Sequence, residues 1–353
     1  MVWLKRRQIL VAMVTTAAIV SGASPAVHAQ SSGSRRIAFD TVVGVQDIFR
    51  ETRDSPTMVV IDPLMGAEIR RRLQVTVRPK IYRLNREWDL MLDQASVDYS
   101  FHAGSNWRIE AGKFPSTVGL GMTENRSNVN PGVFWWHRPY YMPLPRLGAG
   151  APMVSLVSAT YPSGVAVASS ATHWDVRAAL VDTAPVQFWR GNTGADRKLN
   201  RVLGAGLTPR QGLRFGVSTA GGDLTDAPAG NYRLINVEGD YSVGYTRISG
   251  EATHDTFDMP DGDYAVWGWT LQAQHTVTPR LFVHARATEI QAPGLAGAPP
   301  AGVRPFRALD STVGYRIDPE LTLRVGYSAV RTWGATAVDH QAGLSLMWSR
   351  RWW

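Results

Sequence analysis

The chain has 353 residues, including 13 Trp, 33 Gly, 21 Pro and no Cys, and its formal net charge is +8. The absence of cysteine excludes disulfide frameworks, thiolate zinc sites, a cysteine nucleophile and a lipid-modified N-terminal cysteine. Beyond residue 30 no segment approaches 18 uninterrupted apolar residues, which excludes a helical membrane protein. The composition is typical of an aromatic-rich β protein.

Residues 1–29 have the form of a removable export signal. Lys5, Arg6 and Arg7 form a basic start, residues 9–20 are apolar, and residues 27–29 precede a cleavage site at Gln30. Loss of the three basic residues lowers the formal charge from +8 to +5. Because the mature protein is exported, we expect no nucleic-acid partner. Residues 30–36 are predicted to be a flexible N-terminal tail.

After residue 70 the dominant hydrophobic pattern has a period of two, which predicts strands, and the pattern is weaker before it. In 321–329, for example, Leu, Leu, Val, Tyr and Ala alternate with Thr, Arg, Gly and Ser. We predict about 16 strands, within a range of 14 to 18. They are 37–48, 58–69, 73–84, 94–102, 105–113, 153–161, 164–183, 201–208, 212–220, 231–238, 240–251, 264–276, 280–290, 307–317, 320–332 and 340–352.

Short and long connections alternate along these strands. Tight turns recur, as at Pro279-Arg280 and Pro319-Glu320, because proline ends a strand where the chain reverses. Between them lie the long segments 114–152, 184–200, 221–230, 252–263, 291–306 and 333–339. This asymmetry predicts an all-β fold for residues 37–353. The predicted fold is a transmembrane, antiparallel, up-and-down β-barrel in the bacterial outer membrane, with short periplasmic turns and long extracellular loops.

Aromatic residues lie near the predicted strand ends, which is where the headgroups of outer-membrane lipid lie. They are Trp107, Trp174, Tyr232, Tyr264, Trp333, Trp348 and Trp352. An alternative reading is core filling in a secreted soluble β-sandwich. An aromatic residue closing the last strand is usual in barrels that the assembly machinery recognises. We therefore expect that machinery and outer-membrane lipid to be partners.

The segment Gly112-Lys113-Phe114-Pro115-Ser116-Thr117-Val118-Gly119-Leu120 resembles a motif of Gram-negative phosphate-selective porins and related β-barrel porins. The proline directly follows the phenylalanine here, which departs from the family pattern. The resemblance implies a passive channel for small solutes, often a homotrimer, with a loop folded into the lumen. It does not fix the solute, because the lysine-rich phosphate ladder of the selective members is not visible.

If the aliphatic faces meet lipid, seven basic residues point into the lumen, because a charge at the lipid midplane costs about 2–4 kcal/mol. These predicted pore-lining residues are Arg78, Lys80, Arg108, Arg177, Arg214, Arg286 and Arg324. Such a row favours anions. Alternatively, inward acids such as Asp98, Glu110, Asp175 and Asp310 pair with them as salt bridges that only stiffen the wall.

The segment 114–152 is predicted to fold into the barrel as a constriction, because loops this long are usually functional and its aromatic density argues against disorder. Its candidate residues are Arg126, Trp135, Trp136, His137, Arg138, Tyr140, Tyr141 and Arg146. The alternative is an external loop packed in a trimer contact.

Other chemistry finds little support. Asp255, Asp258, Asp261 and Asp263 fall in one predicted loop without the spacing of an EF-hand, so we predict a solvated acidic loop and no metal site. A G-x-S-x-G elbow is absent and the histidines lack ligand spacing, although a Ser–His pair assembled across strands stays open. We predict a porin for ion transport and passive diffusion of small hydrophilic solutes, with no enzyme activity and no cofactor. The alternative is a non-conducting barrel acting as a structural protein, an adhesin or a lipid-active enzyme.

Overall fold

The computed structural model describes residues 37–50, 56–70, 72–84, 87–101, 106–120, 126, 128–145, 147, 152–158, 160–188, 198–224, 230–295 and 303–352. The predicted export signal (1–29), the predicted tail (30–36) and Arg146 lie outside these residues. Among the described residues, no helix is long and apolar enough to cross a membrane.

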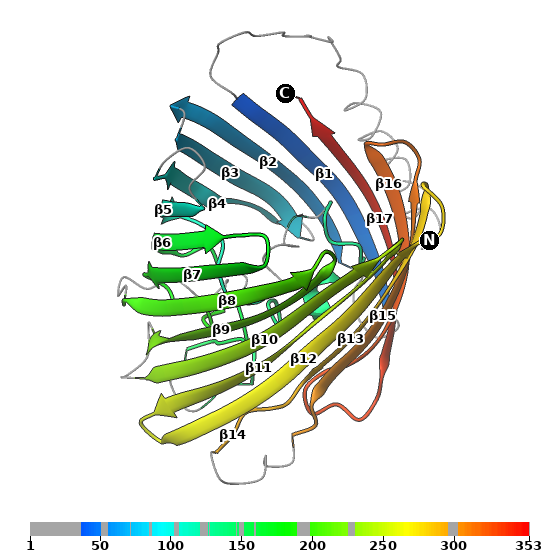
Figure 1. Cartoon of the computed structure of the whole chain (residues 1–353). Coiled ribbons are helices and arrows are strands. Elements are labelled where there is room, and N and C mark those ends of the chain that lie inside the picture. The colour runs from blue at the N-terminus through cyan, green and yellow to red at the C-terminus, as the bar shows by residue number, and fades with distance from the viewer. Residues whose placement is uncertain are drawn as a thin grey trace. The chain divides into compact units, whose positions relative to one another are not determined.

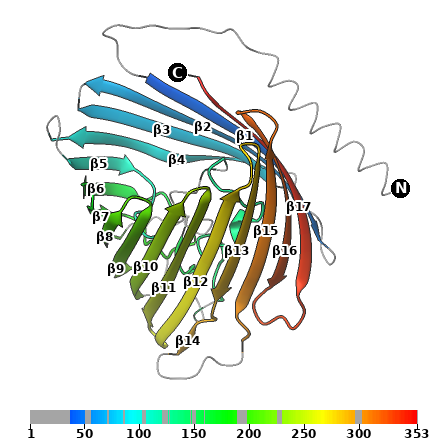
Figure 2. The same ribbon diagram turned by 45° about the vertical axis from the view of Figure 1, so that its right-hand side comes forward.

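The barrel is closed and antiparallel, and it contains sixteen long strands (Figures 1 and 2). Closure occurs between the first and last strands, where Val43 pairs with Trp348. The predicted fold class is therefore confirmed. The strands are β1 (Ile37–Arg50), β2 (Thr57–Arg70), β3 (Leu73–Leu84), β4 (Glu87–Ser100), β5 (Trp107–Lys113), β6 (Ser163–Ser170), β7 (Trp174–Val181), β8 (Asn200–Arg210), β9 (Leu213–Asp223), β10 (Asn231–Val243), β11 (Thr246–Met259), β12 (Gly262–Thr276), β13 (Leu281–Ile290), β15 (Phe306–Arg316), β16 (Leu321–Arg331) and β17 (Asp339–Arg351).

Two short elements complete the described structure. The two-residue strand β14 (Gly294–Leu295) pairs with β12. The 3-10 helix η1 (Trp135–His137) lies in the long connection between β5 and β6.

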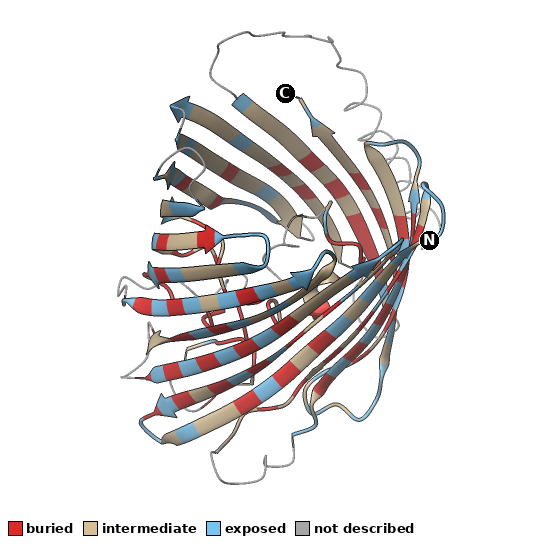
Figure 3. Cartoon of the chain, in the orientation of Figure 1, coloured by how far each residue is buried: buried red, intermediate tan, exposed pale blue. Residues whose placement is uncertain are grey.

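Burial alternates along the strands, as Figure 3 shows by its banding. In β10, Leu234 and Asn236 are buried on the inner face, whereas Ile235 and Val237 are more than half exposed on the outer face. An apolar outer face and a mixed inner face are what a barrel surrounded by lipid requires, because only the outer face meets hydrocarbon.

The predicted strand number is right although two predicted strands are wrong. Segment 164–183 is a hairpin of β6 and β7, closed by a backbone hydrogen bond from Ala171 N to Trp174 O (2.7 Å), at a position without Gly or Pro. Segment 153–161 is not a strand. Its described residues make only isolated bridges, such as Val154 to Gln187. An alternating apolar pattern indicates extended, half-buried backbone, but it does not say whether a neighbouring strand is there to pair.

Two predicted boundaries along β10 to β12 are also wrong. The turn between β10 and β11 lies at 244–245, so the strands predicted as 231–238 and 240–251 are longer and displaced. The predicted loop 252–263 consists mostly of strand, because β11 continues to Met259 and β12 begins at Gly262. Pro260-Asp261-Gly262 is a strong turn sequence, and Gly262 has the positive φ of +136° that favours glycine.

The described residues of the connection between β5 and β6 (114–162) lie inside the ring of strands in Figures 1 and 2. Its apolar residues form the largest buried cluster of the described structure together with inner-face residues of the wall. Tyr232, predicted at the headgroup level, is 2% exposed and belongs to this inner cluster. The core of the molecule is therefore in the lumen.

Candidate functional site

The loop 114–162 contacts strands from several parts of the wall, which fixes its place inside the barrel. The side-chain amide of Gln46 on β1 donates to the Val133 carbonyl (2.6 Å), and the Val133 amide donates to Thr312 Oγ1 on β15 (3.1 Å). Arg324 on β16 donates to the Asn128 carbonyl (3.3 Å). These strands lie on both sides of the closure, so one short segment of loop binds the inner face across it.

Asp310 on β15 is the centre of the strongest anchor. The Arg286 guanidinium donates to Asp310 Oδ2 (2.6 Å) and also to the Phe134 carbonyl of the loop. His137 Nδ1 lies 2.9 Å from Asp310 Oδ1. The side chains of all three are no more than 3% exposed. A buried carboxylate that holds a guanidinium and an imidazole at once ties η1 to the wall.

This anchor contains a serine, a histidine and an aspartate, but not in the arrangement of a catalytic triad. Ser328 Oγ lies 3.2 Å from His137 Nδ1, the same ring nitrogen that faces Asp310. A general base needs its other nitrogen on the nucleophile. Ser328 is also fully buried, so a substrate has no access to its hydroxyl. The geometry is that of a structural anchor.

A second anchor holds the loop to β11 and β12. The Tyr140 hydroxyl donates to Glu251 Oε2 (2.5 Å), and the Leu120 amide donates to the same oxygen (3.1 Å). Arg138 donates to Gln272 Oε1 (2.8 Å). Gly119 has a φ of +69°, and a Cβ there would meet Tyr140 Oη at 2.1 Å, so this approach requires glycine.

Apolar packing fills the lumen along the loop end of β10 to β16. Leu156 and Val118 of the loop are fully buried, as are Leu234, Phe257 and Phe306 on the inner wall. Segment 182–188 adds Val186 to this cluster. This side, which we call the filled side, has the character of a protein core.

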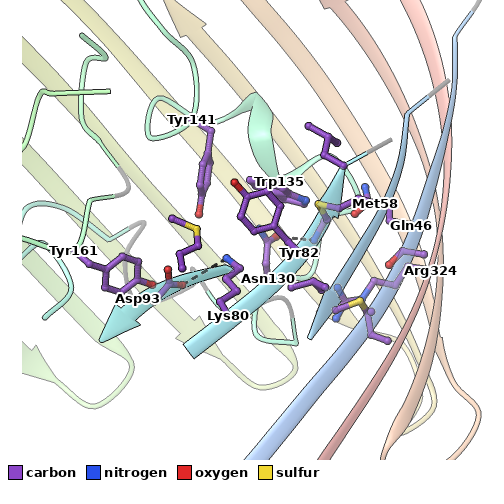
Figure 4. Close-up of a pocket in the computed structure, with 17 residues that line it drawn as sticks. Gln46, Met58, Lys80, Tyr82, Asp93, Asn130, Trp135, Tyr141, Tyr161 and Arg324 are labelled. Atoms are coloured by element: carbon purple, nitrogen blue, oxygen red, sulfur yellow. Dashed lines mark hydrogen bonds and ion pairs between the residues drawn. The ribbon is translucent and has the colours of Figure 1, made fainter. Parts of the chain in front are cut away.

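A cavity of about 100 Å³ remains on another side of the lumen, along β1 to β4 and reaching β16 and β17 (Figure 4). We call it the methionine pocket, because Met58, Met91 and Met347 line it. Its other lining residues are Gly44, Gln46, Val60, Lys80, Tyr82, Leu84, Asp93, Asn130, Gly132, Trp135, Tyr141, Tyr161, Arg324 and Ser345.

The charges beside the methionine pocket are ordered in a chain of ion pairs. Arg78 donates from two nitrogens to the Asp62 carboxylate (2.7 and 2.6 Å) and from a third to Tyr161 Oη (2.7 Å). Lys80 Nζ lies 3.6 Å from Asp93 Oδ2. Lys80 is 19% exposed whereas Asp93 is 2% exposed, so the accessible charge is positive.

Two loop tyrosines at this pocket stay neutral. Burial raises the pKa of the Tyr141 phenol, and it raises the pKa of the Tyr161 phenol well above its ordinary value. Both hydroxyls therefore act as neutral hydrogen-bonding groups rather than as anions beside Lys80.

A second cavity of about 520 Å³ lies beneath the loop at the short-turn end of β7 to β11. Arg214 bridges Asp175 (3.0 Å) and Glu238 (2.5 Å), and Arg177 lies 3.8 Å from Glu238. Arg247 pairs with Asp240 on the same wall. This wall is polar, in contrast to the filled side above it.

All seven basic residues predicted for the lumen share the inner face, but only some reach a cavity. Lys80 and the nearly buried Arg324 line the methionine pocket, and Arg177 and Arg214 line the cavity beneath the loop. Arg108 is exposed, and its pairing with Ala168, opposite Arg177, places it on the inner face. Arg78, Arg286 and Arg324 are at most 5% exposed, so they act on the lumen mainly through bonds within the wall and loop.

The predicted loop residues likewise divide into those that line a cavity and those that are buried in contacts with the wall. Trp135 and Tyr141 line the methionine pocket. His137, Arg138 and Tyr140 are buried in the anchors, and Trp136 packs against the cluster of Ile48, Val133 and Phe134. Arg126 pairs with Asp40 and lies 4.0 Å from Asp62. Arg146 lies outside the described residues.

The sequence analysis missed the inner-face acids Asp62, Asp93, Glu238 and Glu251. Strand parity places Asp62 and Glu238 on the inner face, because they alternate with outward aliphatic residues such as Ile61 and Val237. The inner-face position of Glu251 could be recognised only from the tertiary structure. The predicted acidic loop is wrong, because Asp255 is fully buried on the inner face whereas Asp258 is exposed on the outer one. Within the described residues no three metal-ligating side chains come together.

Comparison with known proteins gives structural relatives only. No protein-family model matches the chain, and no curated protein matches it in sequence. The fold is similar to OmpF of Salmonella typhi in a complex with daunomycin (TM-score 0.62, 11% identity, covering 89% of this chain and 97% of that one). It is also similar to the outer membrane protein OmpT of Vibrio cholerae (0.60, 10%, 92% and 100%). The third is an anion-selective porin from Comamonas acidovorans (0.57, 11%, 90% and 100%).

Identities this low show the fold alone. They show that the chain shares the fold of outer-membrane barrels, and they do not single out the phosphate-selective porins. The chain therefore has the fold of a sixteen-stranded outer-membrane barrel with a long loop folded into its lumen.

Proposed function

We propose that this protein is a passive outer-membrane channel for small hydrophilic solutes, with a preference for anions. The observation that carries the proposal is the incomplete filling of the lumen. The loop is anchored inside the barrel, yet cavities lined by charged side chains are left on the β1–β4 side and beneath the loop. A barrel serving only as an anchor or adhesin has no need of charged internal cavities. Outer-membrane lipid, the assembly machinery and a homotrimer remain proposed partners.

The proposed preference for anions rests on two ion pairs in which the cation is the accessible member. In the Lys80–Asp93 pair the lysine is 19% exposed and the acid 2%. In the Arg177–Glu238 pair the arginine is 22% exposed and the acid 1%. In these two pairs a solute meets the cation more than its partner, whereas Arg214 and Asp175 in the cavity beneath the loop are about equally exposed (25% and 28%). A narrow wall of low dielectric strengthens the field of the accessible cations.

The test is the reversal potential of the refolded mature barrel in a planar bilayer under a KCl gradient. We expect stepwise conductance that reverses toward the chloride potential. Lys80→Glu and Arg177→Glu should each move the reversal toward the potassium potential, whereas Arg201→Glu, on the exposed outer face, should leave it unchanged. A folded barrel that carries no current would contradict the proposal.

A further inference from the structure

The lining of the methionine pocket has two chemically distinct parts. Its apolar lining consists of Met58 on β2, Met91 on β4 directly opposite Lys80, and Met347 on β17, together with Val60 and Leu84. Methionine side chains are flexible and polarizable, so they adapt to apolar ligands of irregular shape. Tyr82 and Trp135 add aromatic surface. A channel wall that only contacted water would not require three methionines around one cavity.

Of the charged groups that line the pocket, the most accessible is the Lys80 ammonium, whereas Asp93 beside it is buried. Lys80 Nζ makes no hydrogen bond to any described residue, and its one ion pair, with Asp93, is 3.6 Å long. The Asn130 side-chain carbonyl accepts from the Gly132 amide (3.0 Å), which turns the amide nitrogen of Asn130 away from that contact. Asp93 is buried and lies between Lys80 and Arg78, 3.9 Å from the latter. An incoming anion therefore finds an accessible ammonium group whose acidic partner is shielded.

Figure 4 shows how these groups lie. Lys80, Asp93 and Tyr161 are on one side of the pocket, and Gln46 and Arg324 are on the other. Tyr82 and Trp135 lie between the two sides. The cavity of about 100 Å³ is smaller than the roughly 150 Å³ in which an apolar protein cavity holds one benzene molecule, so a ring enters only as the flexible methionine side chains move.

From this arrangement we infer that the methionine pocket is a binding site for small amphipathic monocarboxylates that carry one ring or a short chain. The carboxylate lies at Lys80 and the apolar body lies against Met58, Met91 and Met347. This inference rests on the proposed function only in placing the pocket on the route of solutes. It differs from a general preference for anions, because it requires affinity to rise with the apolar body at constant charge.

Binding is measured on the folded barrel in detergent, by saturation-transfer NMR titration with three probes. Benzoate carries both parts, benzamide lacks the charge, and acetate lacks the apolar body. We expect benzoate to bind at least tenfold more tightly than either of the others, because a charge-assisted hydrogen bond and the burial of a ring each contribute a factor of this size.

Two variants separate the contribution of the Lys80 charge to binding from that of the apolar lining. Lys80→Gln should remove the difference between benzoate and benzamide, and Met58→Gln should reduce the difference between benzoate and acetate. Lys80→Arg keeps the charge and should keep the first difference. Arg108→Gln removes a cation from the inner face outside the pocket, and it should change neither. Heat-modifiable mobility on gels shows that each variant is folded.

Equal affinity for benzoate and acetate would overturn the inference, as would benzoate binding that Lys80→Gln leaves unchanged. Chloride conductance of the same preparation tests the proposed function separately. If the barrel conducts chloride without favouring benzoate, the proposed channel function stands and the proposed binding site is refuted. If the barrel binds benzoate through Lys80 without conducting, the proposed binding site stands and the proposed channel function is refuted.

Discussion

The two sides of the lumen differ in what the same loop does to them. On the filled side, inner-face residues such as Leu234 and Phe257 are apolar and pack against the loop at no exposure. On the β1–β4 side, Lys80 and Asp93 occupy equivalent inward positions, and a cavity remains. Loop and wall pack together where both are apolar or where the loop pairs a wall charge, as His137 does with Asp310, whereas a cavity remains beside Lys80 and Asp93. The inner-face residues of the wall therefore determine where the loop packs.

The strongest test of the filled side is Asp310→Ala. It leaves Arg286 buried without its carboxylate, and removal of one partner of a buried ion pair costs about 3–5 kcal/mol. We expect that loss in the free energy of unfolding by urea, together with a rise in conductance as η1 loosens. Asp258→Ala removes an exposed acid and should lie within about 0.5 kcal/mol of the parent. A comparable loss in both variants would show that Asp310 is not an anchor.

Leu156→Ala tests whether the apolar packing itself holds the loop. Leu156 is fully buried in the lumen cluster, and such a truncation costs roughly 2–5 kcal/mol. Met153 lies on the same segment but is 48% exposed, so Met153→Ala should cost much less. Urea unfolding of the two variants measures the difference. Equal stability would mean that this segment does not form a core.

The boundary between the two sides should respond to alkaline pH through Tyr141. Burial raises the pKa of its phenol, so its contribution to stability is complete below the ordinary value of about 10 and is lost as pH rises above it. Between pH 10 and 11 we expect the parent to lose about 1 kcal/mol more than Tyr141→Phe. Parallel pH profiles of unfolding free energy would contradict this account.

The open side should show the smallest effect on stability. The Lys80–Asp93 pair is long and its lysine partly exposed, so Lys80→Gln should cost less than about 1 kcal/mol. The same substitution should shift ion selectivity in the bilayer. A loss of several kcal/mol on unfolding would mean that Lys80 belongs to a core, and the contrast between the two sides would fail.

The barrel could be predicted from the sequence because its repeating signal is local. Alternation such as that of Leu321, Leu323 and Val325 specifies a strand and its lipid face without any knowledge of neighbours. The hairpin at 170–174 was missed because it lacks Gly and Pro. The turn at Pro260-Asp261-Gly262 was missed although its sequence is characteristic, because four aspartates around it suggested a loop.

The lumen was harder to predict, since its contacts join residues far apart in the chain. Parity alone placed Arg286 inward, but only the structure shows that Asp310 and Phe134 bury it. Parity likewise could not distinguish Lys80, which reaches a cavity, from Arg78, which Asp62 holds in the wall. Accessibility inside a barrel depends on where the loop settles, and a strand's own sequence does not record that.

The central claim is that the β1–β4 side is open to solutes while the filled side is closed. Because the chain contains no cysteine, single Cys substitutions can be labelled without background. Lys80→Cys and Ala308→Cys place a thiol on each side, the second within the lumen cluster. During chloride conductance, a small anionic methanethiosulfonate should react quickly with the first and reduce the current, and it should not react with the second. Equal reaction at both positions, or reaction at Ala308→Cys alone, would contradict the account.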